Sequence, residues 1–181
     1  MIYLITGGAR SGKSRFAQQL ARDLSESPVY VATARRWDDD FNNRIRRHQL
    51  DRDDRWESFE AEKTLSFYNY SGRVVVVDCV TLWLTNYFVD LEGDPDQCRE
   101  AAQSELRRLF GQEATFIFVS NELGMGLHAD TPAGRKFVDL QGWTNQFIAS
   151  RADYVYLMVS GIPVAVKGKQ FPESGGALSN H

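Results

Sequence analysis

The stretch TGGARSGKSR, residues 6–15, decides the fold class of this chain. The pattern G-x-x-x-x-G-K-[ST] is filled by Gly7, Gly12, Lys13 and Ser14. A short apolar run, YLIT (3–6), precedes it, and apolar residues recur at helical spacing from Phe16 to Leu24 after it. A strand, a glycine loop and a helix in this order predict a phosphate-binding loop. A glycine-rich turn without a ligand is the alternative interpretation.

The loop also predicts how a nucleotide is held. Backbone N–H groups and the N-terminus of the following helix would face phosphate, which predicts contacts from Gly7, Gly8, Ala9, Arg10, Ser11, Gly12, Lys13 and Ser14. We expect Lys13 to reach the β- and γ-phosphates and the Ser14 hydroxyl to ligate Mg²⁺. Asp78 follows four valines, at a strand end where P-loop proteins place a second carboxylate for this ion. Asp78 could instead be the N-cap of the helix that DCVTLWLTN predicts.

The rest of the chain alternates between apolar strands and helical patterns. We expect strands at 3–6, 29–34, 74–79, 115–120 and 154–161, with an edge strand at 163–167. Helical patterns lie near 38–52, 80–90, 97–110 and 133–151. This order predicts an α/β, P-loop NTPase-like fold with a mostly parallel central sheet and helices on both faces. We expect one nucleotide-binding domain over 1–167 and a loose polar tail over 168–181.

The composition narrows the possible functions. A chain of 181 residues suits one domain, and a net charge of −3 provides no global basic field for nucleic acid. No apolar run approaches the roughly 18 residues that span a bilayer, and the apolar start is too short for a signal peptide. The two cysteines, Cys79 and Cys98, match no zinc or disulfide pattern. We therefore expect a cytoplasmic protein with reduced thiols and no membrane span.

A cluster of arginines around one histidine is the unusual feature. The segment DDDFNNRIRRHQLDRDDRW (38–56) surrounds His48 with Arg44, Arg46, Arg47, Arg52 and Arg55. Nearby cations disfavour the imidazolium form, which keeps the ring neutral and nucleophilic. Arginines also bind phosphate, so the ring is suited to attack phosphorus and form a phosphoramidate. The alternative is a surface histidine on a solvated basic helix.

Several motifs occur together and in order: GGARSGKS, YVATA, RIRRHQLDRDDRW followed by Glu60, VDCVTLWLTN, SNELGMGL and VYLMVSGIP. Over residues 2–167 the chain resembles the bifunctional adenosylcobinamide kinase / adenosylcobinamide-phosphate guanylyltransferase family of cobalamin biosynthesis. The P-loop is shared by many families, whereas R-I-x-x-H and S-N-E-x-G-M-G are far more specific. The resemblance implies phosphorylation of the aminopropanol hydroxyl of adenosylcobinamide by ATP or GTP. It also implies transfer of GMP from GTP, through a covalent GMP-histidine, to the phosphorylated corrinoid.

The resemblance assigns roles to individual residues. His48 takes the guanylylated position and Lys13 acts in the phosphate loop. Further nucleotide contacts are implied for Ala32, Thr33, Ala34, Gln49, Leu50, Asp51, Arg52, Glu60 and Asp78. Mg²⁺, held by Ser14 and Asp78, a corrinoid substrate and a homotrimer with active sites near subunit contacts are also implied.

The sequence departs from the family pattern at two positions, and three alternative interpretations accompany the expectations above. Arg47 stands where some relatives have a second histidine, and Ser58 replaces a commoner threonine. The loop residues Asn121, Glu122, Gly124 and Gly126 can shape a corrinoid or nucleotide site, or only supply turn backbone with φ > 0. Another P-loop small-molecule kinase without covalent GMP, and a nucleotide-gated interaction module without a metabolite substrate, are the competing functions.

Overall fold

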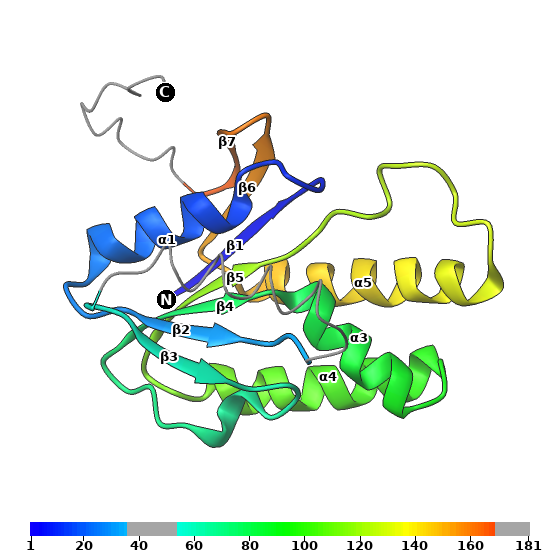
Figure 1. The fold of residues 1–181 in the computed structure, drawn as a ribbon, viewed down its shortest axis with the longest axis horizontal. Helices are drawn as coiled ribbons and strands as arrows, with labels where there is room; N and C mark the ends of the chain where they lie inside the picture. The colour runs from blue at the N-terminus through cyan, green and yellow to red at the C-terminus, as the bar shows by residue number, and fades with distance from the viewer. Residues whose placement is uncertain (36–53, 169–181) are drawn as a thin grey trace.

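The computed structural model describes residues 1–35 and 54–168, which form a seven-stranded sheet with helices on both faces (Figure 1). The strands are β1 (Ile2–Gly7), β2 (Val29–Ala32), β3 (Glu57–Glu60), β4 (Val74–Asp78), β5 (Thr115–Val119), β6 (Tyr154–Val159) and β7 (Ile162–Lys167). The helices are α1 (Lys13–Leu24), α3 (Val80–Asp90), α4 (Pro95–Phe110) and α5 (Pro132–Arg151), with a short 3₁₀ helix, η1, at Leu65–Phe67. The strand order is β3-β2-β4-β5-β1-β6-β7. Only β7 runs antiparallel to its neighbour among these strands, which confirms the predicted fold class.

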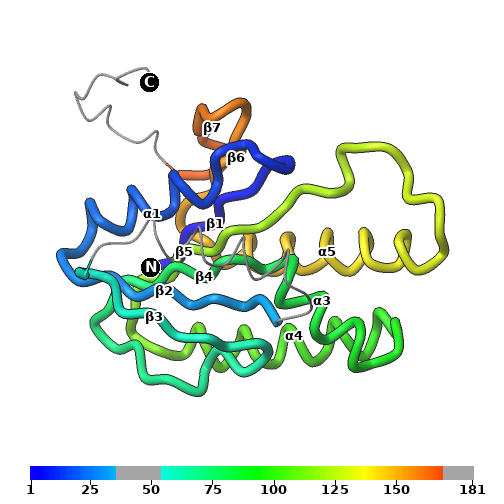
Figure 2. Tube along the Cα trace, in the orientation of Figure 1, coloured from blue at the N-terminus to red at the C-terminus, as the bar shows by residue number. Residues whose placement is uncertain are grey.

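The two faces of the sheet carry separate apolar clusters, because successive side chains of a strand point to opposite faces. On β4, Val75 and Val77 pack on the side of α3, α4 and α5, whereas Val74 and Val76 pack on the side of α1. Figure 2 shows α1 alone on one face and the other three helices opposite it. The run of four valines is therefore explained by a central parallel strand that is covered on both faces.

Side-chain caps define where the two longest helices begin. The Asp94 carboxylate accepts hydrogen bonds from the N–H groups of Asp96 and Gln97, both at 3.0 Å, and proline follows it at the first helical position. The Thr131 hydroxyl accepts from the Gly134 N–H at 3.0 Å in the same way. Such caps satisfy backbone donors that have no partner within the helix. They fix the start of both helices on the sheet face opposite α1.

The structure differs from the sequence prediction at one edge of the sheet. Strand β3, with the sequence ESFE, was not predicted, and it pairs in parallel with β2. Its residues are largely exposed, so it has no apolar signature of a buried strand. The edge strand predicted at 163–167 is present as β7. The helix predicted near 38–52, and the tail from residue 169 onward, lie outside the described residues.

Candidate nucleotide site

The loop between β1 and α1 has a backbone that only glycine accommodates at two positions. Gly7 has φ 147° and Gly12 has φ 92°. A Cβ atom on Gly7 would lie 2.7 Å from the Met158 carbonyl oxygen, and one on Gly12 would lie 3.2 Å from the Gly161 Cα. The two glycines of the motif are thus required both by φ and by the close approach of the β6–β7 hairpin.

Lys13 lies inside this loop rather than in solvent. It is 7% exposed, and its Nζ donates hydrogen bonds to the Gly8 carbonyl and, at 3.5 Å, to the Ser11 hydroxyl. Burial lowers the pKa of Lys13, an effect that nearby Cys79 and Asp78 oppose. The N-terminus of α1 has no side-chain cap, so its first N–H groups are available to an anion. An ammonium group and helix N–H groups that converge on one loop form a site for phosphate.

Asp78 ends β4 beside this loop. Its Oδ2 accepts a hydrogen bond from the Tyr30 hydroxyl at 2.9 Å. The N-cap of α3 is Cys79, without a side-chain cap, so the alternative role of Asp78 as the helix cap is wrong. The Ser14 hydroxyl and this carboxylate are hard oxygen donors of the kind that Mg²⁺ prefers. Over residues 1–35 and 54–168, no group of three or more histidine, cysteine or acidic side chains could hold a metal by itself.

Three predicted site residues from different strands lie side by side at the carboxyl edge of the sheet. Ala32 is in register with Glu60 on one side and with Asp78 on the other. The row continues from Asp78 to Val119 of β5, which is in register with Ile5 of β1, two residues before Gly7. Carboxyl edges of open parallel sheets carry the ligand crevice, so this register brings the motifs of β2, β3 and β4 to the phosphate loop.

Thr33 has a structural role at the carboxyl edge of the sheet. It is completely buried, and its hydroxyl accepts from the Cys79 N–H and donates to the Cys79 carbonyl, both at 2.8 Å. Burial raises the pKa of the Cys79 thiol to about 12, so this thiol is not a nucleophile at neutral pH. The side chain of Thr33 therefore ties β2 to the start of α3. Its neighbours Ala32 and Ala34 are only half-buried.

The loop after β5 is joined to the phosphate loop. The Glu122 N–H donates to the Gly7 carbonyl at 3.0 Å, and the Asn121 carbonyl accepts from the Asn145 amide at 3.1 Å. Neither Gly124 nor Gly126 has a positive φ, so the interpretation of these glycines as left-handed turn residues is wrong. Both glycines line a small pocket of about 150 Å³, together with residues that include Leu123, His128, Arg135 and Asp139.

The sequence motifs did not reveal every residue that shapes the site. Tyr30, which binds Asp78, and Gly161, which contacts the loop, lie within the quoted motifs YVATA and VYLMVSGIP but were assigned no role at the site. The positions His48, Gln49, Leu50, Asp51 and Arg52 lie outside the described residues. Within the described part of the chain, no helix is long and apolar enough to cross a membrane.

The strand order, the glycine loop and the buried lysine define a P-loop nucleotide-binding protein of the α/β class. Residues 3–166 match the model of the family described as cobinamide kinase / cobinamide phosphate guanyltransferase, and the chain belongs to this family. The resemblance inferred from the motifs is thus confirmed, and the protein is an enzyme of this family in cobalamin biosynthesis.

Two curated relatives cover nearly the full chain. The bifunctional adenosylcobalamin biosynthesis protein CobP of Pseudomonas aeruginosa is 38% identical over 170 residues, with 92% of this chain and 97% of the relative covered. The corresponding protein CobU of Escherichia coli K12 is 36% identical over 182 residues, with 92% and 100% covered.

Two solved structures match the chain at low sequence identity. One is an ATPase domain with a TM-score of 0.43 at 13% identity, for which the match covers 86% of this chain and 68% of that domain's chain. The other is the flagellar accessory protein FlaH of Methanocaldococcus jannaschii, with a TM-score of 0.44 at 14% identity, covering 92% and 78%.

Proposed function

We propose that the protein catalyses two successive reactions at one triphosphate site. In the first, ATP or GTP phosphorylates the aminopropanol hydroxyl of adenosylcobinamide. In the second, GMP passes from GTP to adenosylcobinamide-phosphate through a covalent intermediate on His48, giving adenosylcobinamide-GDP. The observation that supports this proposal best is the buried Lys13 inside a formed phosphate loop, beside the carboxylate that ends β4.

The described residues divide the binding of the triphosphate among them. Gly7, Gly8, Ala9, Arg10, Ser11 and Gly12 offer backbone N–H groups, and Lys13 offers a cation that balances charge on the transferred group. The Lys13 ammonium already donates a hydrogen bond to a loop carbonyl. A bound phosphate would replace this neutral acceptor with a charged oxygen, which forms a stronger hydrogen bond. Ser14 and Asp78 would hold Mg²⁺, which supplies charge neutralisation and orientation of the phosphates when bound.

The two reactions use different phosphorus atoms of the nucleotide. In the kinase step, the corrinoid hydroxyl attacks the γ-phosphorus, and the bond to the β-phosphate oxygen breaks. In the transfer step, an imidazole nitrogen of His48 attacks the α-phosphorus of GTP and pyrophosphate leaves. An oxygen of the corrinoid phosphate then attacks the same phosphorus, the P–N bond breaks and the imidazole is restored. A covalent intermediate divides a transfer between two large molecules into two simpler steps.

Connectivity supports the involvement of the histidine segment. Residues 36–53 join the described residues 35 and 54, and residue 35 follows β2 at the carboxyl edge where Asp78 and Glu60 lie. We propose contacts to the nucleotide from Glu60, Ala32, Ala34 and the segment Gln49, Leu50, Asp51 and Arg52. For Thr33 the proposal is limited to van der Waals contact, because its hydroxyl is engaged by Cys79, its N–H donates to the Asp78 carbonyl at 3.2 Å and its carbonyl accepts from the Asn86 amide at 2.8 Å.

A homotrimer is proposed as well. Strand β7 exposes a stripe of apolar side chains, with Ile162 66%, Val164 46% and Val166 65% exposed. Alternate residues of a strand share one face, so these three form a continuous patch on an edge strand. Sedimentation velocity would measure the oligomeric state, and Val164→Glu in this stripe would be expected to dissociate the assembly. A variant that sediments like the native protein would exclude this face as the contact.

Guanylylation of the protein itself tests the function directly. After incubation with Mg²⁺ and GTP labelled at the α-phosphate, we expect a label on the chain that is labile to acid and stable to base. His48→Ala should remove the label and retain transfer of the γ-phosphate to adenosylcobinamide, whereas Lys13→Ala should abolish both reactions. Absence of label on folded, GTP-binding protein would refute the transfer step and leave a simple P-loop kinase as the function. Binding of GTP with slow hydrolysis, unaffected by adenosylcobinamide, would instead indicate an interaction module.

A further inference from the structure

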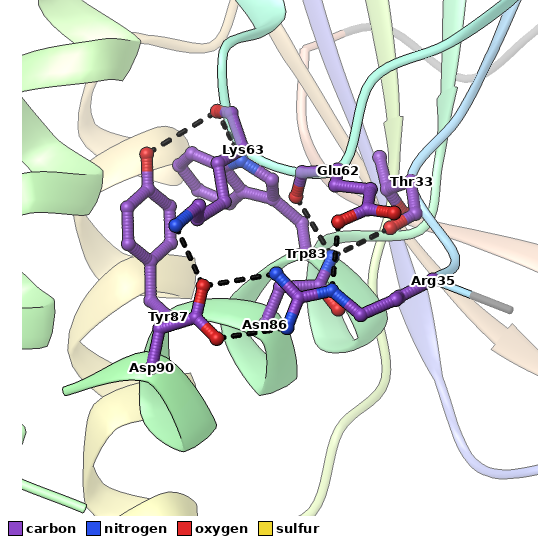
Figure 3. A network of polar contacts seen from close by, with 8 residues as sticks. All are labelled: Thr33, Arg35, Glu62, Lys63, Trp83, Asn86, Tyr87 and Asp90. Atoms are coloured by element: carbon purple, nitrogen blue, oxygen red, sulfur yellow. Dashed lines mark hydrogen bonds and ion pairs between the residues drawn. The ribbon is translucent and has the colours of Figure 1, made fainter. Parts of the chain in front are cut away.

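Three elements meet in a polar network at the carboxyl ends of β2 and β3 (Figure 3). Arg35 follows β2, Glu62 and Lys63 follow β3, and Asp90 is the last residue of α3. The Arg35 guanidinium contacts both Asp90 carboxylate oxygens, at 2.8 and 2.9 Å, and its Nε contacts Glu62 at 2.7 Å. The Lys63 ammonium lies 2.6 Å from Asp90. We call these four side chains the Arg35 network.

Neutral side chains of α3 hold the backbone under the Arg35 network. Asn86 is completely buried, and its amide nitrogen donates to the carbonyls of Thr33 and Glu62, both at 2.8 Å. The Trp83 indole N–H donates to the Lys63 carbonyl at 2.8 Å. One helix therefore binds the backbone of both strand exits, and Figure 3 shows Trp83 and Asn86 of α3 pointing toward Lys63, Glu62 and Thr33. The position of Arg35 is therefore determined both by the hydrogen bonds of its own side chain and by the bond from Asn86 to the nearby Thr33 backbone.

The ion pairs of the Arg35 network orient side chains and contribute little to the stability of the fold. The Asp90 side chain is 28% exposed and that of Arg35 is 23% exposed, and ion pairs near solvent contribute little to stability. Hydrogen bonds from Arg35, and then from Lys63, hold the pKa of Asp90 far below its usual value, so the carboxylate stays charged at all working pH values. A planar guanidinium that is bound at both ends of its fork and at Nε has one orientation.

This orientation bears on the reaction because of where Arg35 lies in the chain. Thr33, two residues earlier, is bonded to Cys79 next to Asp78, and thus belongs to the rigid edge of the nucleotide site. His48 follows Arg35 by thirteen residues. We propose that Arg35, held by Asp90, is a positioning residue for guanylyl transfer, because it sets the point and direction at which the chain leaves β2. The proposal rests on the function proposed above, with His48 as the attacking group.

The Arg35 network is not needed for phosphoryl transfer if this proposal holds. The groups proposed for phosphoryl transfer, Lys13, Ser14 and Asp78, all lie outside the segment that follows Arg35. Asp90→Asn should therefore slow the single-turnover rate of protein guanylylation by about tenfold, since a misplacement of about 1 Å can cost up to a hundredfold. The rate of γ-phosphate transfer at saturating nucleotide should stay within about twofold of the native value. Asp90→Glu, which restores the charge, should recover part of the guanylylation rate.

Two further variants make the test specific. Arg35→Lys keeps the charge and removes the fork, and should behave like Asp90→Asn. The control is Asp96→Asn, which breaks another exposed ion pair, Arg99–Asp96 at 2.8 Å on α4, and should leave both rates unchanged. Thermal denaturation of each variant excludes unfolding as the cause.

The outcomes separate the two proposals. Native protein without a covalent GMP label would refute the proposed function, whatever the variants do. If the native protein is labelled and Asp90→Asn is labelled at the same rate, the positioning role is wrong and the function stands. An equal loss of guanylylation and phosphoryl transfer would also overturn the positioning role, because it would show a general effect on the fold.

Discussion

The contact between the β6–β7 hairpin and the phosphate loop leads to a prediction about Gly161. Its N–H donates to the Ser11 carbonyl at 3.0 Å, and its Cα lies where a Cβ atom of Gly12 would need space. Gly161 has φ 86°, and nothing lies within 4 Å of the position of its own Cβ. Gly161→Ala therefore tests the backbone conformation alone, without a steric clash.

The size of the effect follows from this geometry. A non-glycine residue in the left-handed region costs roughly 1–2 kcal/mol. If the hairpin shifts to avoid that cost, the bond to Ser11 is weakened, which is worth about 0.5–1.5 kcal/mol. Since about 1.4 kcal/mol corresponds to a factor of ten in affinity, Gly161→Ala should weaken nucleotide binding by about two- to tenfold.

Isothermal titration with GTP and thermal denaturation would measure the two consequences. The matched control is Gly72→Ala, because Gly72 has φ 75°, an open Cβ position and an N–H bonded to the Glu113 carbonyl at 2.8 Å, with no contact to the phosphate loop. Both variants should lose similar stability, roughly 2–4 °C in Tm for each kcal/mol. Only Gly161→Ala should lose affinity. Native affinity in Gly161→Ala, or an equal loss in Gly72→Ala, would refute the role of the hairpin as a support of the loop.

Three further predictions concern stability. Arg108→Ala should lower Tm more than Arg107→Ala does, because the Glu105 carboxylate is buried and Arg108 is bonded to it at 2.6 Å, and equal shifts would contradict this. Burial raises the pKa of Cys98 to about 11, so the stability that its neutral thiol contributes is complete below about pH 9 and is lost as the pH rises from 9 to 11. Denaturant unfolding at pH 8 and pH 10.5 should show this loss of stability. Cys98→Ala should reduce the difference between the two pH values. Trp83→Phe removes the shorter of two hydrogen bonds to the Lys63 carbonyl, the other coming from the Tyr87 hydroxyl at 3.2 Å, and leaves space at a fully buried site. It should cost about 2 kcal/mol in urea unfolding, whereas an unchanged midpoint would show that the Tyr87 hydroxyl is a sufficient donor.

Local patterns were sufficient for most of the sheet and its helices. The buried strands β1, β4 and β5 are apolar runs, and α4 and α5 carry helical periodicity behind a capping residue and a proline. Strand β3 could not be found in this way, because ESFE is polar and exposed and is a strand only through its pairing with β2. Its pairing also decides that Glu60 lies next to Ala32 rather than elsewhere in a loop.

The sequence by itself determined the phosphate loop and the family, because the bonds that shape the loop join residues a few positions apart and leave a readable pattern. Only the tertiary structure decided which distant residues meet at the carboxyl edge of the sheet. Arg35 and Asp90 are 55 residues apart, and no local pattern predicts that a guanidinium and a carboxylate so distant in the chain will share two hydrogen bonds. The same holds for Thr33, for which the resemblance implied a nucleotide contact and whose hydroxyl the fold gives to Cys79. The register of parallel strands brings such residues together, and that register is set by the packing of the whole sheet.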